Sequence, residues 1–194
     1  MNTAPAGLQL WAPNLRPIAG RIFLLPLMRH QEVERLFALT AEAFGSPVPQ
    51  PLAHTAKGRL LEYAQFTRHQ SEKALESGVD TQPLEIRLYA AAHSLGLEYR
   101  RRLDLRNFRE AISTVHLVYK ALGIGFRVTL DGDVEISHCA FAKVYTPKIC
   151  ALVSALDRGL VAGITGGATL KFTRRITEGA TSCRATITGG PEWK

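Results

Sequence analysis

The sequence predicts an α+β fold, with a layer of helices first and a ββαββ unit with an antiparallel sheet last. Over residues 29–122, apolar side chains recur every three to four positions, which is typical of amphipathic helices. In two later segments, 126–138 and 170–187, apolar and polar residues alternate as they do in half-buried strands. A chain of 194 residues can bury one good core, so we expect a single domain over residues 27–190.

The segment 1–26 is expected to form an arm outside that domain. It contains four prolines and two glycines, which interrupt helices and strands. Residues 27–123 then form the helical part and residues 124–190 the ββαββ part.

Four helices are expected in the helical part. The first two run over residues 29–44 and 55–77, and a third begins at Pro83. The fourth begins after Asn107, because Glu110 three residues later completes a pattern typical of a helix N-terminus.

The ββαββ part opens with a predicted hairpin. Residues 126–130 and 134–138 alternate in polarity, and Asp131, Gly132 and Asp133 between them are typical of a tight turn.

A helix and two further strands complete the unit. Pro147 is expected to begin the helix, which three glycines end between residues 163 and 167. Its apolar face predicts packing on the sheet. A third strand is expected from Leu170 to Ile176 and a fourth from Cys183 to Ile187.

The sequence argues against several classes of protein. No apolar run approaches the roughly 20 residues that cross a bilayer, so we expect no membrane insertion. Three cysteines, an odd number without framework spacing, predict a reducing compartment, and we expect the cytoplasm. The sequence has no glycine-rich phosphate loop and no serine in a nucleophile elbow. Standard cofactor-dependent redox chemistry is therefore not expected.

Two motifs carry a resemblance to known families. The runs HCAFAKVYTPKIC, ending at Cys150, and RRITEGATSC, ending at Cys183, resemble the C-terminal half of the 4-vinyl-reductase domain family. This resemblance implies binding of small, largely apolar or aromatic molecules between the helical layer and the sheet, and pairing as a homodimer. The pattern is also similar to the amino-thiazoline-carboxylate hydrolase family, so a cysteine-dependent hydrolase is the alternative.

The chain departs from the first family at its zinc site. The resemblance implies four zinc ligands, of which Cys150 and Cys183 match two, while Phe172 and Arg175 occupy the positions of the others. Because structural zinc needs four donors and a guanidinium cannot become one, we expect no metal and no cofactor. Cys150 and Cys183 are expected to lie near each other as neutral thiols.

The resemblance and the helix pattern together predict a closed apolar cavity. Its expected wall consists of Phe108, Ile112, His116, Tyr119, Phe126, Val153 and Leu156. For His116 the alternative is a core residue bound to a backbone carbonyl.

Cys139 and Cys150 are the candidate catalytic residues if the protein is a hydrolase. Cys150 lies in the first turn of the helix after Pro147, where the helix dipole lowers a thiol pKa, and Cys139 lies at a loop entrance. Alternatively, both are small buried hydrophobes. His138 precedes Cys139 on a strand, so the two side chains should point to opposite faces.

A second alternative function is nucleic-acid binding. The chain has 24 Lys and Arg against 17 Asp and Glu, a net charge of +7. A local cluster that could neutralise phosphates consists of Arg100, Arg101, Arg102, Arg106 and Arg109. No aromatic and basic alternation suited to base stacking accompanies it, and a solvated helix end is the simpler interpretation.

Overall fold

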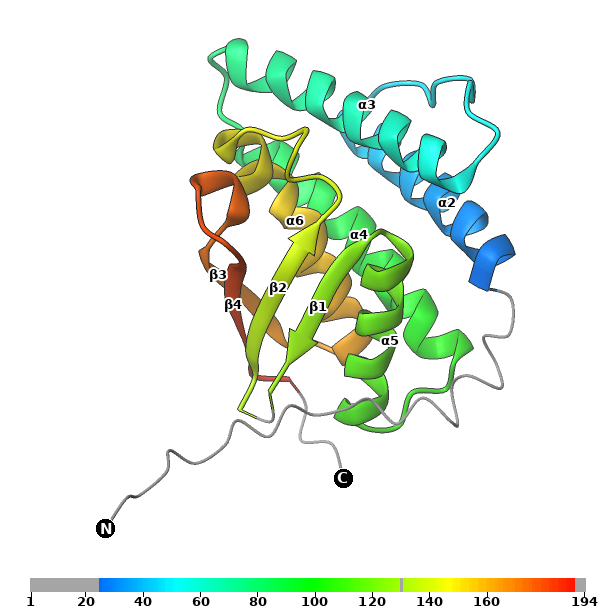
Figure 1. Ribbon diagram of the computed structural model, residues 1–194, viewed down its shortest axis with the longest axis vertical. Coiled ribbons are helices and arrows are strands. Elements are labelled where there is room, and N and C mark those ends of the chain that lie inside the picture. The colour runs from blue at the N-terminus through cyan, green and yellow to red at the C-terminus, as the bar shows by residue number, and fades with distance from the viewer. Residues whose placement is uncertain (1–24, 130, 191–194) are drawn as a thin grey trace.

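The computed structural model describes residues 25–129 and 131–190 and has the predicted α+β architecture (Figure 1). The four N-terminal helices are α2 (Leu25–Phe44), α3 (Ala56–Glu76), α4 (Gln82–Arg102) and α5 (Phe108–Ala121). They are followed by β1 (Ile124–Val128), β2 (Asp133–Cys139), α6 (Pro147–Thr165), β3 (Thr169–Arg174), the 3-10 turn η1 (Ile176–Glu178) and β4 (Cys183–Thr188). The predicted order, helices first and a ββαββ unit last, is confirmed.

The predicted N-terminal arm lies outside the described residues as far as residue 24, and so does Leu130. The helix after the arm begins at Leu25 rather than at residue 29, so Pro26 belongs to the helix. Proline fits there because the first helical turn does not use its backbone N–H groups.

Side chains recognised in the sequence cap the helices. Asn107 Oδ1 accepts a hydrogen bond from Glu110 N at 2.9 Å, as predicted. The Glu110 carboxylate accepts from Arg106 N rather than from Asn107 N, so the capping box is shifted by one residue. Thr146 Oγ1 accepts from Ile149 N in front of α6, and Gly166 ends that helix with a φ of +79°.

The sheet has the strand order β1-β2-β4-β3, and all neighbouring strands are antiparallel. Its inner face carries the buried side chains Phe126, Val128, Val134, Ile136, Leu170, Ala185 and Ile187. The third strand is shorter than predicted: it ends at Arg174, just after a bulge between Phe172 and Arg174, and Ile176 lies in η1. The bulge interrupts the regular pairing with β4 near the end of the strand.

Helices α4 and α6 pack against each other backbone to backbone. A Cβ added at Gly159 would lie 2.2 Å from Tyr89 O, and one at Gly163 would lie 2.3 Å from His93 O. Gly96 of α4 meets the same surface, since a Cβ there would lie 2.6 Å from Leu160 O. These glycines allow the closest helix contact of the fold and position α6 between α4 and the sheet (Figure 1).

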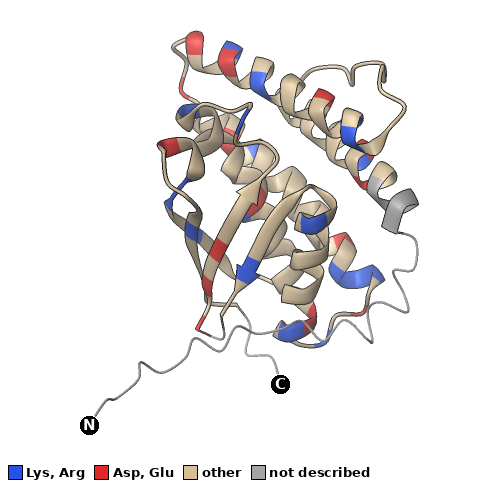
Figure 2. Cartoon of the chain, in the orientation of Figure 1, with Lys and Arg blue, Asp and Glu red and all other residues tan. Residues whose placement is uncertain are grey.

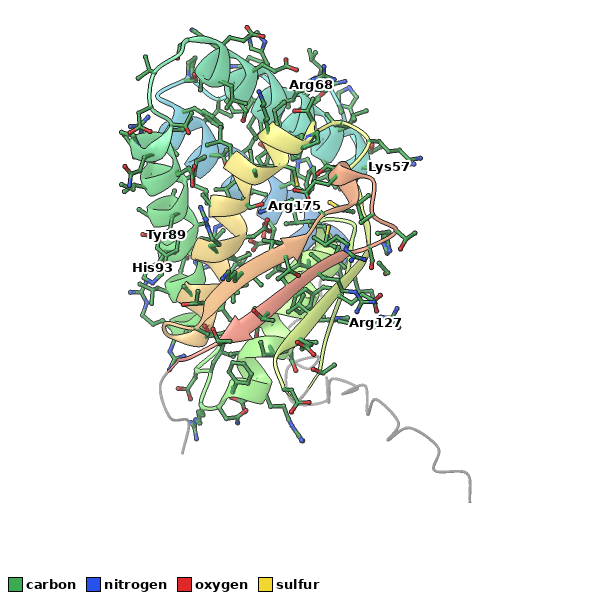
Figure 3. All side chains as sticks on the ribbon, turned by 90° about the vertical axis from the view of Figure 1, so that its left-hand side faces the viewer. Lys57, Arg68, Tyr89, His93, Arg127 and Arg175 are labelled. Atoms are coloured by element: carbon green, nitrogen blue, oxygen red, sulfur yellow. The ribbon has the colours of Figure 1, made fainter. Side chains whose placement is uncertain are left out.

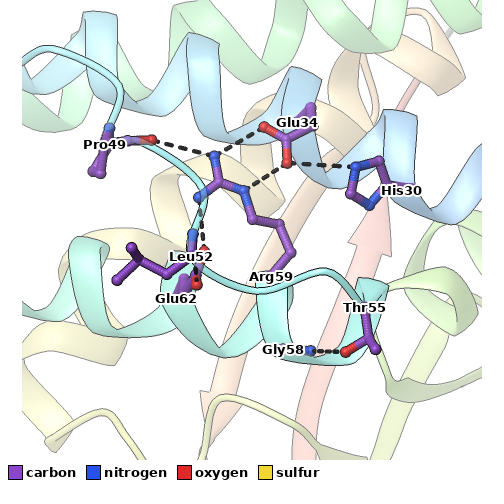
Figure 4. A network of polar contacts seen from close by, with 8 residues as sticks. All are labelled: His30, Glu34, Pro49, Leu52, Thr55, Gly58, Arg59 and Glu62. Atoms are coloured by element: carbon purple, nitrogen blue, oxygen red, sulfur yellow. Dashed lines mark hydrogen bonds and ion pairs between the residues drawn. The ribbon is translucent and has the colours of Figure 1, made fainter.

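Helices α2 and α3 form an outer pair joined by Arg59 (Figure 4). The Arg59 side chain, only 1% exposed, donates to Glu34 from Nε at 2.5 Å and to Glu62 from Nη1 at 2.8 Å. Its guanidinium also lies 4.1 Å from the ring centre of Phe37. It lies just below the surface, because both glutamates remain partly exposed.

Basic and acidic side chains are interspersed along the helices and strands (Figure 2). Among the helices that the structure describes, none combines the length and the apolar character needed to cross a membrane.

Candidate ligand-binding cavity

A cavity of about 100 Å³ lies between the helices and the inner face of the sheet. Helices α2, α3, α4 and α5 contribute Leu36, Tyr63, Leu95 and Tyr119 to its wall. The sheet adds Ile124, Ile136 and Phe172, and α6 adds Val153, Leu156 and Leu160. The cavity therefore collects side chains from nearly every element of the fold.

Aromatic rings form one side of the wall. Phe141 and Tyr145 of the loop before α6 are stacked with centroids 5.5 Å apart, and Tyr63 meets Phe141 edge to face at 5.9 Å. The hydroxyl of Tyr145 hydrogen-bonds Thr67 Oγ1 at 2.5 Å, and that of Tyr63 pairs with Thr40 Oγ1 at 3.2 Å. Both hydroxyls point away from the cavity toward polar partners, so the rings present apolar faces to the cavity.

Asp157 on α6 is the buried acid of the cavity. Tyr119 Oη donates a hydrogen bond to Asp157 Oδ1 at 2.7 Å. Burial raises the pKa of Asp157 from 3.8 to about 6, although the Tyr119 hydrogen bond and the charges of Arg175 and Arg158 act in the opposite direction. Asp157 is half-buried and lines the cavity.

All three cysteines line the same cavity. Burial raises the pKa of Cys139 to about 12, and it raises the pKa of Cys150 and of Cys183 as well. Cys150 and Cys183, which are expected from the sequence to lie near each other, both line this cavity, and a charge on Cys183 would raise the pKa of Cys150 further. Cys183 Sγ also accepts a hydrogen bond from Ile176 N at 3.3 Å, which ties η1 to the last strand. All three side chains are therefore thiols, not thiolates, at neutral pH.

Arg175 lies beside α6, at the end of β3 and in front of η1 (Figure 3). Its guanidinium carbon lies 5.0 Å from the ring centre of Phe172, and its Nη1 is 3.5 Å from Glu178 Oε1. Its Nε is buried and has no hydrogen-bond partner among the described residues, and the same is true of Thr177 Oγ1. Thr177 lies close enough to Cys150 to lower the pKa of its thiol, but Thr177 Oγ1 and Cys150 Sγ lack the geometry of a hydrogen bond.

Of the predicted wall residues, the structure brings Tyr119, Val153 and Leu156 to the cavity. Phe108, Ile112, His116 and Phe126 lie outside the wall, in or beside the core between α5 and the sheet. His116 Nδ1 pairs with Phe126 O at 3.0 Å, which is the alternative stated for this histidine, and the Phe126 ring stacks on Tyr119 at 5.0 Å. The Phe126 ring therefore supports Tyr119 from behind.

The histidine beside Cys139 takes the opposite face of the strand, as predicted. The His138 ring covers Gly125, where an added Cβ would lie 2.4 Å from His138 Nδ1, while Cys139 faces the cavity. The His138 imidazole therefore does not pair with the Cys139 thiol.

The arginine cluster is held by contacts within the chain. Arg102 pairs with Glu98 at 3.0 Å, and Arg106 with Asp104 at 2.6 Å. The side chain of Arg100, in α4, extends to the end of α6, where its Nη1 donates to Ile164 O at 3.4 Å. Such contacts are typical of a solvated helix end.

Within residues 25–129 and 131–190, no three or more His, Cys, Asp or Glu side chains are arranged to hold a metal ion. Phe172 and Arg175 stand beside the two cysteines on the cavity wall. The expected absence of zinc stays a prediction, which elemental analysis of the purified protein tests.

Sequence reasoning missed Asp157, Tyr63, Tyr145 and the place of Arg175 on the cavity wall. Asp157 has a signal: it follows Val153 by four residues, inside the apolar face of its helix, where an acid is out of place. Tyr145 has none, because its place depends on how the loop before α6 folds back on α3.

The chain matches no protein-family model, no curated protein and no solved structure. The function is therefore argued from the cavity itself.

Proposed function

We propose that this protein binds a small apolar or aromatic molecule in the cavity between its helices and its sheet. The observation that carries the proposal is a cavity with an aliphatic and aromatic wall and a few polar groups that converge on it. Small-molecule sites in proteins have this composition.

The size of the cavity sets the size of the buried part of the ligand. An apolar cavity of about 150 Å³ accommodates benzene, so about 100 Å³ suits a single ring or a short acyl chain with small adjustments of the wall. Larger ligands would require displacement of the η1 segment or of the loop before α6.

We further propose that the protein acts as a homodimer, as the family resemblance implies. Its site works without zinc, because Phe172 and Arg175 stand where the family has two of its four ligands. The cysteine hydrolase receives less support than the binding domain, because burial raises the pKa of all three thiols and His138 lies on the other face. Nucleic-acid binding also receives less support, since Arg102 and Arg106 are paired with acids.

A direct test is titration with toluene, followed by thermal unfolding and by changes in the NMR spectrum of the protein. A ligand that binds only the folded state raises its stability, by about 2.7 kcal/mol at one hundred times the Kd. We expect a higher Tm and resonance shifts that centre on the cavity.

A matched pair of variants assigns the effect to the cavity. Ala142→Leu adds three carbons to a residue of the wall, whereas Ala151→Leu makes the same change on the exposed side of α6. We expect the first variant to lose toluene binding and the second to keep it. Equal binding by both variants, or none by the wild type, would contradict the proposed function. Native mass spectrometry of freshly purified protein then searches for the natural ligand.

A further inference from the structure

Two buried polar atoms that lack hydrogen-bond partners within the described part of the chain belong to one part of the cavity wall. Among the described residues, three buried side-chain atoms lack a hydrogen-bond partner, and two of them, Arg175 Nε and Thr177 Oγ1, belong to residues of the cavity wall. The third, Ser71 Oγ, lies in α3 and does not line the cavity. A buried polar atom without a partner destabilises a fold, so two of them at one place need a reason.

Arg175 and Thr177 belong to one short segment. β3 ends at Arg174 after its bulge and η1 follows, and both residues line the cavity. Ile176 N donates a hydrogen bond to Cys183 Sγ, and Arg175 N donates to Glu178 Oε2 at 3.0 Å, so the backbone is tied at residues 175 and 176. Both unpartnered atoms are therefore carried by a fixed turn at the cavity wall.

We propose, on the basis of the binding function above, that the ligand is a small carboxylic acid whose apolar part fills the cavity and whose carboxylate accepts hydrogen bonds from Arg175 Nε and Thr177 Oγ1. A guanidinium and a hydroxyl are donors, and a carboxylate offers two acceptor oxygens to such a pair. An ionised Asp157 offers only acceptors and therefore does not bind a carboxylate directly; its Oδ1 accepts a hydrogen bond from Tyr119.

The acid of the cavity makes the proposal sharper. The positive charge of Arg175 is close enough to lower the pKa of Asp157, although burial raises it more. An ionised Asp157 would therefore repel a bound carboxylate, while a neutral amide at that position would not. Removing this charge should strengthen the binding of an anion and weaken that of a cation.

The experiment compares four probes of nearly the same shape at neutral pH: benzoate, benzamide, toluene and benzylamine. For the wild type, we expect benzoate to bind most tightly. Arg175→Gln should lower the affinity for benzoate about tenfold to one-hundredfold, the usual effect of losing a hydrogen bond to a charged group. Its affinity for toluene should change little.

Two more variants complete the design. Thr177→Val keeps the shape of the side chain and removes the hydroxyl, so it should lower the affinity for benzoate alone. If Arg175→Gln does not fold, this variant provides the test instead. Asp157→Asn should strengthen benzoate and weaken benzylamine. The control is Arg174→Gln, an exposed arginine next in the chain, which changes net charge equally and should leave all four affinities unaltered.

The outcomes separate this inference from the proposed function. If toluene binds and benzoate binds no better in the wild type than in Arg175→Gln, the carboxylate assignment is wrong and the binding function stands. Tightest binding of benzylamine would overturn the assignment in favour of Asp157 as the anchor. Binding of none of the four probes would contradict both proposals.

Discussion

Among single residues, Asp157 has the environment least suited to its charge. Its pKa in the folded protein, about 6, lies above its ordinary value of 3.8, so the folded state holds the proton more tightly than the unfolded state does. The resulting stabilisation is fully present below the unfolded pKa of 3.8 and is lost as pH rises through about 6. Folding is thus favoured by acid at this one residue, against the usual trend for carboxylates.

Asp157→Asn should remove that pH dependence. The shift between 3.8 and about 6 corresponds to about 3 kcal/mol. We expect the free energy of unfolding of the variant, relative to wild type, to rise by about this amount between about pH 4 and pH 7. Urea denaturation of both proteins over this range measures the difference, in which all other titrations cancel. Parallel pH profiles would show that Asp157 is ionised equally in both states.

The three cysteines should react slowly with alkylating agents at neutral pH. Burial raises the pKa of each thiol, and the thiolate is the reactive form. We expect iodoacetamide to label Cys139, Cys150 and Cys183 at low rates in the folded protein and rapidly in urea, as followed by peptide mass spectrometry. Fast labelling of Cys139 or Cys150 alone would revive the hydrolase alternative.

Among the elements, the start of α5 and both ends of α6 could be predicted from the sequence, whereas the start of α2 and the end of β3 could not. Thr146, Asn107 and the glycines after α6 act within one helical turn, so their effect is visible in the sequence. The bulge after Phe172 depends on the pairing of β3 with β4 across the sheet. For the same reason, the position of Arg175 and Thr177 on the cavity wall could not be predicted.

The contact between α4 and α6 should not tolerate a methyl group. In Gly163→Ala, the new Cβ would meet His93 O and the Cα of Gly96, at 2.3 and 2.8 Å. Overpacking of this kind destabilises by about 1–3 kcal/mol, and more than offsets the gain in helix propensity of about 1 kcal/mol. We therefore expect a lower urea midpoint. Ala151→Ser, on the exposed side of the same helix, should stay within about 0.5 kcal/mol of wild type.

The joint between α2 and α3 should depend on Arg59 more than on an exposed ion pair. Arg59→Ala removes two carboxylate partners and the contact with the Phe37 ring, and we expect a loss of about 2–3 kcal/mol in the free energy of unfolding. Arg68→Ala breaks only the exposed pair with Glu72, at 2.8 Å, and should change stability by less than about 1 kcal/mol. Equal losses in both variants would show that burial of Arg59 adds nothing.

At the scale of the whole molecule, the fold class and the order of elements could be predicted because periodicity is a local property. The cavity could be predicted as a space between helices and sheet, but only part of its wall. Tyr119, Val153 and Leu156 lie on it, whereas Ile112 and Phe126 point into the solid core on the other side of Tyr119. The direction in which a buried side chain points depends on tertiary packing, which apolar periodicity does not record.

The proposed homodimer makes a prediction about mass. Light scattering at micromolar concentration should give twice the 21.3 kDa of the chain, about 43 kDa. A mass near that of one chain would contradict the dimer and leave the cavity proposal intact, because every residue that lines the cavity belongs to a single chain.

The wall of the cavity joins Leu36 of the first described helix to Cys183 of the last strand. During synthesis the ribosome must release residues 36–183 before the two side chains can meet. The complete wall therefore forms only after β4 has joined the sheet, and a fragment that lacks β4 lacks the contribution of Cys183. A ligand of this cavity would thus report that β4 has docked, and a fluorescent one would time that step in a refolding experiment.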